Sequence, residues 1–383
     1  MKKSLLVVLT SLLTVACTSC SSKETIHLQL VPSNDPNTLL SRGKALESVL
    51  AKYEPNYKWT IDVGESYAST MTALTAGQLD GGFLPSAGYA QASIEKPGKA
   101  ELLLSAARNG YKVQQDFPGT DAAAREKQRK AMNDDSYDYR GQQDPTQVNF
   151  YCSVVITLRD SARKEKNLKA LDTDGDGEIS LAEIHDAKAK WGIMKATSSS
   201  GYVYPTKYIY ENGYTRGFID ENAYAKLSEE DSKLYMIGIA QDSYPAMIDN
   251  LMNGVIDVAV GFFDIRYGSA FVQDGGKYKN DETVFTKTYT QAVLDPIMND
   301  TVCAYSGISE EKKKAIKNAL YKAVKDGDVK DDGGKNDVDG DKKPSGSYLL
   351  YQIYSHTNYI EGKDSDYDAA REMYRWTLQQ SKK

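Results

Sequence analysis

The strongest constraint on the fold is an alternation of strand-like and helix-like segments that occurs twice along the chain. The first series comprises, in order, residues 26–31, 39–53, 59–63, 71–76 and 79–84. The second series comprises residues 234–239, 244–252 and 255–263. Apolar residues cluster or alternate in the strand-like segments and recur at helical spacing in the others. Because strands that alternate with helices form parallel α/β sheets, we expect two α/β units, each with its own sheet.

Two further strand-like segments, residues 150–158 and 301–305, are expected to link these units. The chain has 383 residues, which is enough for two domains with separate cores. We predict a first lobe from residues 26–149 and 301–383 and a second lobe from residues 150–300, each a mixed, mostly parallel sheet flanked by helices. A ligand cleft would lie between them, where strand ends converge.

The first residues resemble an export signal. Residues 1–16 contain two lysines followed by leucine, valine and small residues, in a run too short to span a membrane. Thr14-Val15-Ala16-Cys17 reads as a lipobox, so we expect Cys17 to be lipidated and residues 17–25 to be a tether. Cys20 is the rival acceptor, and a cleaved, unlipidated product is the alternative. The predicted location is therefore extracytoplasmic, with the protein held to the membrane by its lipid alone.

Composition and motifs exclude several classes of function. The net charge of −6 argues against nucleic acid, whose binding proteins carry basic faces. The chain has no HExxH, GxSxG or phosphate-loop lysine motif, and His27, His185 and His356 lack the spacing of a catalytic or metal site. We therefore expect a protein that is not an enzyme.

Three stretches read as insertions. Residues 116–147 are polar with few large aliphatic side chains, which predicts a solvated excursion. Residues 325–346 are rich in Asp, Gly and Lys and predict a flexible loop, with a second cation site as the alternative. The third insertion, residues 161–190, contains the sequence of an EF-hand loop at residues 172–183.

That loop matches the calcium-binding pattern position by position. Its predicted ligands are Asp172, Asp174, Asp176, the backbone carbonyl of Glu178, Ser180 and Glu183. Ca²⁺ takes six to eight hard oxygen ligands, and Gly177 at the sixth position allows the tight turn that aims them inward. Helices are expected at residues 167–171 and 182–189. Because no second full loop accompanies it, a structural Ca²⁺ is expected rather than a sensor.

A serine run, residues 198–200, follows the strand-like residues 191–194 and precedes a helix-like segment near residue 204. Hydroxyls and free backbone N–H groups at a helix N-terminus favour an anion. An ordinary turn or helix cap is the competing interpretation.

Together with other motifs, this run resembles the substrate-binding proteins of phosphonate, phosphite and phosphate ABC importers, which have the type 2 periplasmic-binding fold. The matching motifs occur in family order at residues 67–68, 77–89, 151–153, 198–202 with Pro205, 253–260, 299–300 and 364–368. The resemblance implies that a phosphonate-class anion binds between the lobes and that a membrane permease receives it. No nucleic acid is expected among its partners, and a monomer is expected.

The resemblance also implies roles for single residues. Ser198, Ser199 and Ser200 would bind the phosphonate oxygens, and Tyr67 and Tyr151 would add phenol donors. Asp264 and Asp300 stand where relatives hold an ammonium group of the ligand, and Tyr244 stands where the family often has a histidine.

Some alternatives stay open at this stage. A pyrimidine-precursor enzyme or a sulfonate or thiamine-precursor binder would share the fold, and a calcium-dependent surface adhesion or scaffold protein would explain the EF-hand loop. Cys152 and Cys303 lie in the two linking strands. We expect two buried thiols there rather than a disulfide, because a cross-link at a hinge would restrict closure.

Overall fold

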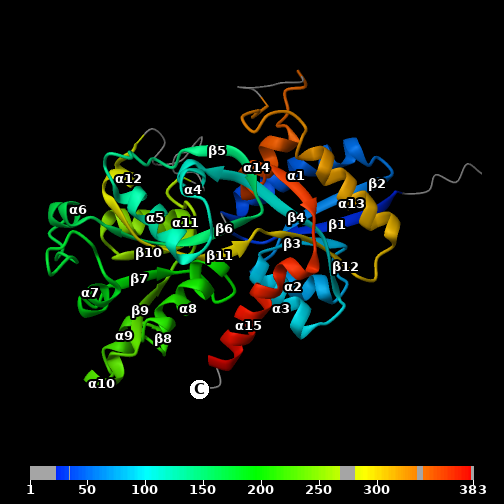
Figure 1. Cartoon of the computed structure of the whole chain (residues 1–383). Coiled ribbons are helices and arrows are strands. Elements are labelled where there is room, and N and C mark those ends of the chain that lie inside the picture. The colour runs from blue at the N-terminus through cyan, green and yellow to red at the C-terminus, as the bar shows by residue number, and fades with distance from the viewer. Residues whose placement is uncertain (1–22, 34, 268–280, 334–339, 381–383) are drawn as a thin grey trace, which may run out of the picture.

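The computed structural model describes residues 23–33, 35–267, 281–333 and 340–380, which form two lobes (Figure 1). The expected signal segment, Cys17 and most of the tether lie outside the described residues, as do residues 334–339 of the predicted flexible loop. Among the residues that are described, no helix combines the length and apolar character that crossing a membrane requires.

The sheet of the first lobe has the strand order β13-β4-β12-β3-β1-β2, and β5 pairs with β4. Its strands are β1 (Glu24–Leu30), β2 (Tyr57–Val63), β3 (Gly81–Leu84), β4 (Ala100–Tyr111), β5 (Gln143–Val148), β12 (Thr301–Tyr305) and β13 (Asn358–Glu361). The strands of the first predicted series, β1, β2 and β3, are parallel, with Leu28 opposite Ile61 on one side and Gly81 on the other. β12 runs antiparallel between β3 and β4, so the sheet is mixed.

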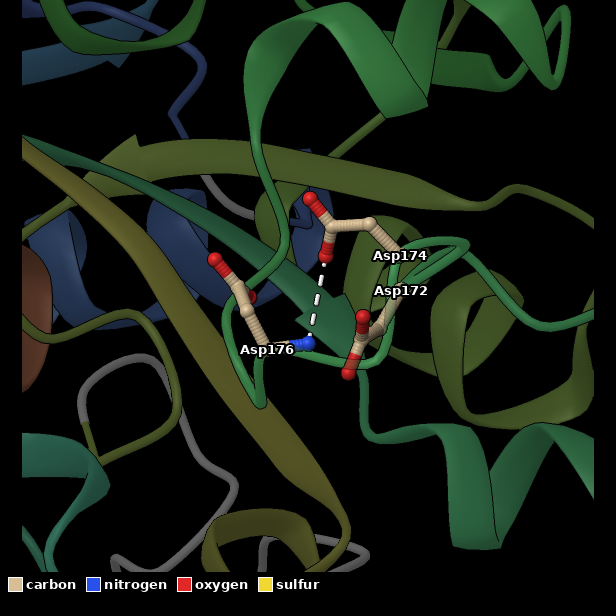
Figure 2. A group of neighbouring side chains, drawn as sticks. All are labelled: Asp172, Asp174 and Asp176. Atoms are coloured by element: carbon tan, nitrogen blue, oxygen red, sulfur yellow. Dashed lines mark hydrogen bonds between the residues drawn. The ribbon is translucent and has the colours of Figure 1, made fainter.

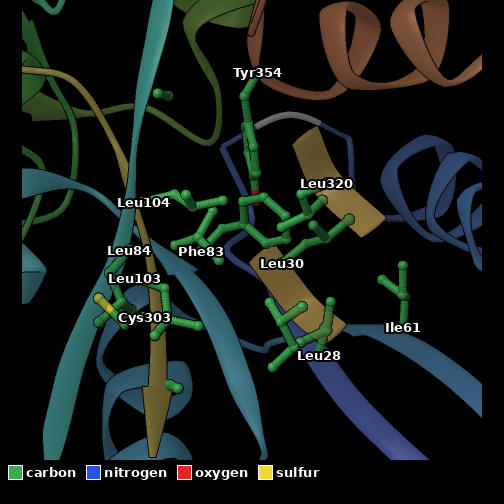
Figure 3. Packing of buried hydrophobic residues seen from close by; sticks show 14 of the residues in the cluster. Leu28, Leu30, Ile61, Phe83, Leu84, Leu103, Leu104, Cys303, Leu320 and Tyr354 are labelled. Carbon is green, nitrogen blue, oxygen red and sulfur yellow. The ribbon is translucent and has the colours of Figure 1, made fainter. Parts of the chain in front are cut away.

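Helices cover this sheet and complete its core. They are α1 (Pro36–Tyr53), α2 (Tyr67–Thr75), α3 (Ser86–Glu95), α13 (Glu310–Ala323) and α14 (Gly346–Tyr354). Figure 3 shows Leu30 and Phe83 of the sheet packed with Leu320 of α13 and Tyr354 of α14. α1 begins where Asp35 accepts a hydrogen bond from the Thr38 N–H, and the helix then turns a buried stripe toward the sheet.

The sheet of the second lobe has the order β11-β6-β10-β7-β9-β8. Its strands are β6 (Phe150–Leu158), β7 (Lys190–Ile193), β8 (Gly217–Ile219), β9 (Tyr235–Ala240), β10 (Val258–Phe262) and β11 (Thr288–Met298). β10, β7, β9 and β8 are parallel, and β6 is antiparallel to both of its neighbours. The helices of this lobe are α4 (Lys112–Asp116), α5 (Ala122–Asn133), α6 (Asp160–Glu165), α7 (Leu181–Asp186), α8 (Tyr204–Glu211), α9 (Glu221–Tyr224), α10 (Glu229–Ser232), α11 (Tyr244–Asn253) and α12 (Thr283–Thr286).

Residues 116–147 differ from the expected solvated excursion. They include α5, which packs on β11 and buries Ala131 and Met132 in the core of the second lobe. Arg129 of α5 is buried as well and donates a hydrogen bond to the Tyr289 hydroxyl at 2.7 Å. The buried face of α5 is built mainly from small and polar side chains. The helix therefore lacks the stripe of large aliphatic residues by which a packed helix is recognised in a sequence. The second lobe therefore also includes α5, although the chain returns to the first sheet as β5 before it enters the second sheet.

The chain crosses between the sheets beside the two expected linking strands. β6 belongs to the second sheet and β12 to the first, so the chain enters and leaves the second sheet through the short segments at residues 148–150 and 298–301. There the Asn299 N–H donates to the Asn149 carbonyl at 3.0 Å. Cys152 and Cys303 lie in different sheets as buried free thiols, which confirms the expectation of no disulfide between them.

The last described helix, α15 (Asp368–Gln380), also connects the lobes. It packs on α3 of the first lobe, and Figure 1 shows it running between the two halves of the molecule. Met373 enters a core cluster of the second lobe, and the Trp376 ring lies 5.1 Å from that of Tyr210.

Candidate ligand-binding site

A cavity of about 200 Å³ lies between the lobes and is lined by residues from both. Seven of the eight predicted ligand residues line it: Tyr67, Tyr151, Ser198, Ser199, Ser200, Tyr244 and Asp300. Segments far apart in the sequence therefore meet at one place, as a ligand site between two lobes requires.

The serine run forms one turn of π-helix, η1 (Ser199–Val203), which leads into α8. Ser198 caps this turn by accepting a hydrogen bond from the Gly201 N–H at 3.2 Å. The Ser153 hydroxyl of β6 donates to the Ser200 carbonyl at 2.8 Å and fixes the turn on the sheet. A side chain at Gly201 would not fit, because an added Cβ would lie 2.5 Å from Met194 Cγ and 2.9 Å from the Tyr244 hydroxyl.

Tyr244 joins the hydroxyls of this loop. Its phenol oxygen lies 2.9 Å from Ser198 Oγ and 3.1 Å from Ser200 Oγ. The ring is held at the start of α11, which Ser243 caps by accepting from the Ala246 N–H. Burial raises the Tyr244 pKa, so the phenol stays protonated and neutral at physiological pH. Where the resembling family often has a histidine, this chain has a neutral hydroxyl.

Ser199 faces the first lobe. Its Oγ lies 3.3 Å from Ser86 Oγ and accepts a hydrogen bond of 3.3 Å from the Ala87 N–H, both at the N-terminus of α3. Sequence reasoning did not single out Ser86. The signal that could have found it is its position directly after the buried strand β3 and Pro85, inside the motif at residues 77–89.

The two predicted tyrosines add hydroxyl groups from the first lobe and from β6. Tyr67 is the first residue of α2, following the cap residue Ser66, and Tyr151 is the second residue of β6. Burial raises the pKa of both phenols well above the ordinary value, which keeps them protonated as donors. The Arg108 guanidinium lies 5.1 Å from the centre of the Tyr151 ring and holds it by a cation–π contact.

Asp300 lines the cavity, but its charge is balanced by the protein. Its Oδ2 pairs with Arg108 Nη2 at 2.6 Å and lies 3.3 Å from His356 Nε2. Burial opposes ionisation of Asp300, yet Arg108 and His356 outweigh it and lower the pKa of the carboxyl below its ordinary value. The carboxylate is therefore ionised and already paired, which differs from the expected role of holding a ligand ammonium.

Asp264 lies elsewhere, and the expectation that it contacts the ligand is wrong. It is fully buried and pairs with Arg266 at 2.6 Å, and Arg266 also donates to Thr288 Oγ1 at 3.0 Å. Asp264 is absent from the lining of the cavity. The arginine two positions later offers this carboxylate a partner within the second lobe, so its charge serves that internal contact.

Two further arginines line the cavity, Arg42 and Arg108. Neither was predicted from the sequence. Arg108 lies near the end of β4, and no motif marks it. Arg42 does carry a signal, because it falls three positions after Leu39 and four before Leu46, on the buried stripe of α1. A charged residue on an apolar stripe must be paired or must face a cavity.

The acidic insertion turns back on itself as an EF-hand loop requires. Carboxylate oxygens of Asp172, Asp174 and Asp176 all lie within 4.8 Å of one another, and Figure 2 shows the three side chains around the turn. The dashed line marks the Asp176 N–H donating to Asp174 Oδ1 at 3.1 Å. Figure 2 also shows that all three belong to one tight loop, so a short chain segment supplies the cluster.

The other predicted ligands lie on the same loop. Ser180 caps α7, and the Glu183 carboxylate accepts hydrogen bonds from the N–H groups of Ser180 and Thr173, at 2.8 and 2.6 Å. Burial raises the Glu183 pKa, but the hydrogen bonds from Ser180 and Thr173 together outweigh it and lower the pKa to about 2, so the carboxylate is ionised. The Glu178 side chain turns away and pairs with Arg129 at 3.1 Å, which leaves its backbone carbonyl as the predicted ligand.

The flanking helices differ from those expected: the incoming helix ends earlier in the chain, and the outgoing helix is shorter. The incoming helix α6 ends at Glu165, so residues 167–171 are not helical, and α7 ends at Asp186. Asp160 at the start of α6 accepts hydrogen bonds from the N–H groups of Leu171 and Asp172, which holds the incoming segment in a non-helical path.

Comparison with known proteins agrees with this geometry. A family model described as ABC transporter, phosphonate, periplasmic substrate-binding protein matches residues 28–367. A search of curated proteins finds no match. Among solved structures, a Pseudomonas aeruginosa binding protein component of an ABC phosphonate transporter is 11% identical, with a TM-score of 0.56, over 94% of this chain and 88% of that one.

Two further structures are similar over almost their whole length. The Prochlorococcus marinus protein PhnD1, solved with methylphosphonate, is 12% identical with a TM-score of 0.55, over 93% of this chain and 99% of that one. A Xanthomonas citri protein solved with ATP is 12% identical with a TM-score of 0.57, over 94% and 98%. At such identities the likeness is one of fold, and it confirms the predicted two-lobed periplasmic-binding architecture.

The family match covers most of the chain and decides its class. Substrate-binding proteins of this kind work outside the cytoplasm, with a small-molecule ligand and a membrane permease as partners, and they are not enzymes. The chain belongs to the family of periplasmic phosphonate substrate-binding proteins of ABC transporters.

Proposed function

We propose that the protein binds one phosphonate- or phosphate-type oxyanion in the cavity between its lobes, with the oxyanion held by Ser198, Ser199 and Ser200. The observation that carries this proposal is the contact of the serine loop with groups of both lobes. Ser198 and Ser200 meet Tyr244 of the second lobe, and Ser199 meets the N-terminus of α3 in the first. An anion placed there would be contacted by both lobes and would favour their closed arrangement.

The chemistry of these donors suits a small, highly charged oxyanion. Serine and tyrosine hydroxyls supply neutral O–H donors, and the N-terminus of α3 adds backbone N–H groups with the favourable end of its helix dipole. Hydrogen bonds to a charged acceptor are stronger than those between neutral groups. Of the two lining carboxylates, Asp300 is neutralised by Arg108, and Asp35 accepts hydrogen bonds from Thr38 at the start of α1.

A thermal-shift screen tests this function. We expect methylphosphonate, phosphite or phosphate to raise the melting temperature, and chloride at equal ionic strength to leave it unchanged. Because binding adds stability of RT ln(1 + [L]/Kd), a ligand at a hundredfold excess over Kd contributes about 2.7 kcal/mol. The absence of a shift with every phosphorus oxyanion, at millimolar concentration, would contradict the proposal.

We further propose that the protein is a monomeric lipoprotein, anchored through Cys17, that delivers its ligand to the permease. The lipobox-like residues 14–17 support the anchor, and the family membership supports the delivery. Membrane fractionation tests the anchor: the wild type should sediment with membranes, and Cys17→Ser should be released. An unchanged distribution of Cys17→Ser would exclude this lipid site.

The insertion is proposed to bind one structural Ca²⁺. The ligands would be Asp172, Asp174, Asp176, the Glu178 carbonyl, Ser180 and Glu183, a set of hard oxygen donors that fits Ca²⁺. The close approach of the three Asp carboxylates supports the fit, since such like charges repel without a cation between them. The Glu178–Arg129 pair ties the loop to α5, so the ion would brace the second lobe away from the ligand cavity.

A further inference from the structure

The lining of the cavity also includes the polar residues Arg42, Ser33 and Gln352, which we call the Arg42 subsite. Arg42 reaches it from α1 and is fixed by Gln352 of α14. Its Nη1 donates to the Gln352 carbonyl at 2.7 Å, and its Nη2 donates to Gln352 Oε1 at 3.2 Å. Both acceptors are neutral, and they use two of the five N–H donors of the guanidinium.

The charge of Arg42 has no counter-ion among the described residues. No carboxylate of the described chain lies within ion-pair distance of it, whereas Arg108 in the same cavity is paired with Asp300. Asp35 also lines the cavity, but its carboxylate accepts from the N–H and hydroxyl of Thr38. Burial lowers the pKa of Arg42, an effect that Tyr348 partly offsets, and this agrees with a desolvated, uncompensated cation.

Ser33 gives a second, independent sign of a missing partner. Its hydroxyl oxygen is enclosed, lines the same cavity, and has no hydrogen-bond partner among the residues that the structure describes. A buried hydroxyl without a partner is costly, and such groups in binding sites are usually completed by a ligand or by water. A guanidinium without a counter-ion and a hydroxyl without a partner, both in the lining of one cavity, therefore favour an anion there.

The volume of the cavity also exceeds what a simple oxyanion needs. The 200 Å³ of the cavity is several times the roughly 30 Å³ that one water molecule occupies in the liquid. Methylphosphonate has only five non-hydrogen atoms. The ligand can therefore extend from the serine loop toward Arg42.

We propose that the Arg42 subsite binds a second anionic group of the ligand, so that the preferred ligand is a phosphonocarboxylate: its phosphonate lies at the serine loop and its carboxylate at Arg42. This inference rests on the proposed function. A carboxylate matches the planar fork of a guanidinium, which binds its two oxygens at once. An aminoalkylphosphonate would instead bring its ammonium toward an unpaired cation, and like charges at close range repel.

Calorimetric titration of the full mature protein tests the inference, with phosphonoacetate, methylphosphonate and 2-aminoethylphosphonate as probes. The wild type should bind phosphonoacetate at least tenfold more tightly than either of the others. Arg42→Gln should lose ten- to hundredfold in affinity for phosphonoacetate, the range expected for a charge-assisted hydrogen bond, while its affinity for methylphosphonate changes less than threefold. Arg42→Lys should fall between them, because it keeps the charge and loses the fork.

Lys44→Gln is the matched control. Lys44 lies on the same helix, but its side chain is half exposed and pairs with Glu47, so this change should leave all three affinities unaltered. An unchanged ratio of phosphonoacetate to methylphosphonate affinity in Arg42→Gln would overturn the inference, as would tighter wild-type binding of 2-aminoethylphosphonate. If the wild type binds phosphate or phosphite but not phosphonoacetate, the inference alone fails; if it binds no phosphorus oxyanion, the proposed function itself fails. The wild-type order of affinities decides the matter even where Arg42→Gln does not fold.

Discussion

Replacing Asp300 by Asn should destabilise the protein by about 3 kcal/mol, because it leaves the Arg108 guanidinium without its counter-charge. The two side chains are only 17% and 16% exposed, and their charged atoms lie 2.6 Å apart. Loss of one partner from a buried pair costs about 3–5 kcal/mol, against about 0–1 kcal/mol at the surface. The residual exposure places this pair near the lower end of the buried range.

Urea unfolding followed by tryptophan fluorescence measures this effect, since Trp59 reports on the first lobe and Trp191 on the second. The midpoint of Asp300→Asn should fall while the slope of the transition stays constant. The double variant Arg108→Gln/Asp300→Asn should recover part of the loss, because it removes both charges. A single variant within about 0.5 kcal/mol of the wild type would refute the view that Asp300 is a paired, buried carboxylate, since surface substitutions cause changes of that size.

Three other outcomes are expected. Burial lowers the His356 pKa, so below about pH 6.5 the unfolded chain binds a proton that the folded chain does not, and stability should fall as pH drops through that value. The difference in urea midpoint between wild type and His356→Gln should therefore shrink from pH 7.5 to pH 5. A difference that stays constant over this range would exclude His356 as the cause. Gly201→Ala should destabilise the protein by about 1–3 kcal/mol, as overpacking does, because the new Cβ meets Met194 and the Tyr244 hydroxyl; a melting temperature equal to that of the wild type would contradict this. Calcium should raise the melting temperature of the wild type and of Glu178→Gln, because that variant keeps the backbone carbonyl of residue 178. It should not raise the melting temperature of Glu183→Gln. A calcium-dependent increase that remains in Glu183→Gln would exclude the loop as the site.

The sequence was informative where local pattern decides structure. The strand and helix series of both lobes follow from the spacing of apolar residues, and the serine loop follows from its place between a strand and a helix. It was less informative where the partner comes from a distant segment. Asp264 and Asp300 look equivalent in sequence, but Arg266 pairs with one and Arg108, from β4, with the other.

The helix α5 and the residue Arg42 show the same limit in two forms. α5 packs with small and polar side chains, so its buried face lacks the pattern by which buried helices are recognised. Arg42 stands on the apolar stripe of α1, which could have marked it, but only the fold shows that α14 and the cavity meet that stripe. Charge pairing and cavity lining depend on tertiary contacts, and periodicity does not encode them.

Calorimetric titration of methylphosphonate into wild type and into Ser198→Ala/Ser200→Ala tests the central claim most directly. Both hydroxyls line the cavity and lie within hydrogen-bond distance of Tyr244, so their loss should remove charge-assisted bonds worth about 1.5–3 kcal/mol each. Thr206→Ala, on the following helix and bonded only to the Tyr202 carbonyl among the described contacts, serves as the control and should bind like the wild type. We expect saturable binding by the wild type and at least a tenfold loss of affinity in the double variant; equal affinities for the two proteins would contradict binding at the serine loop.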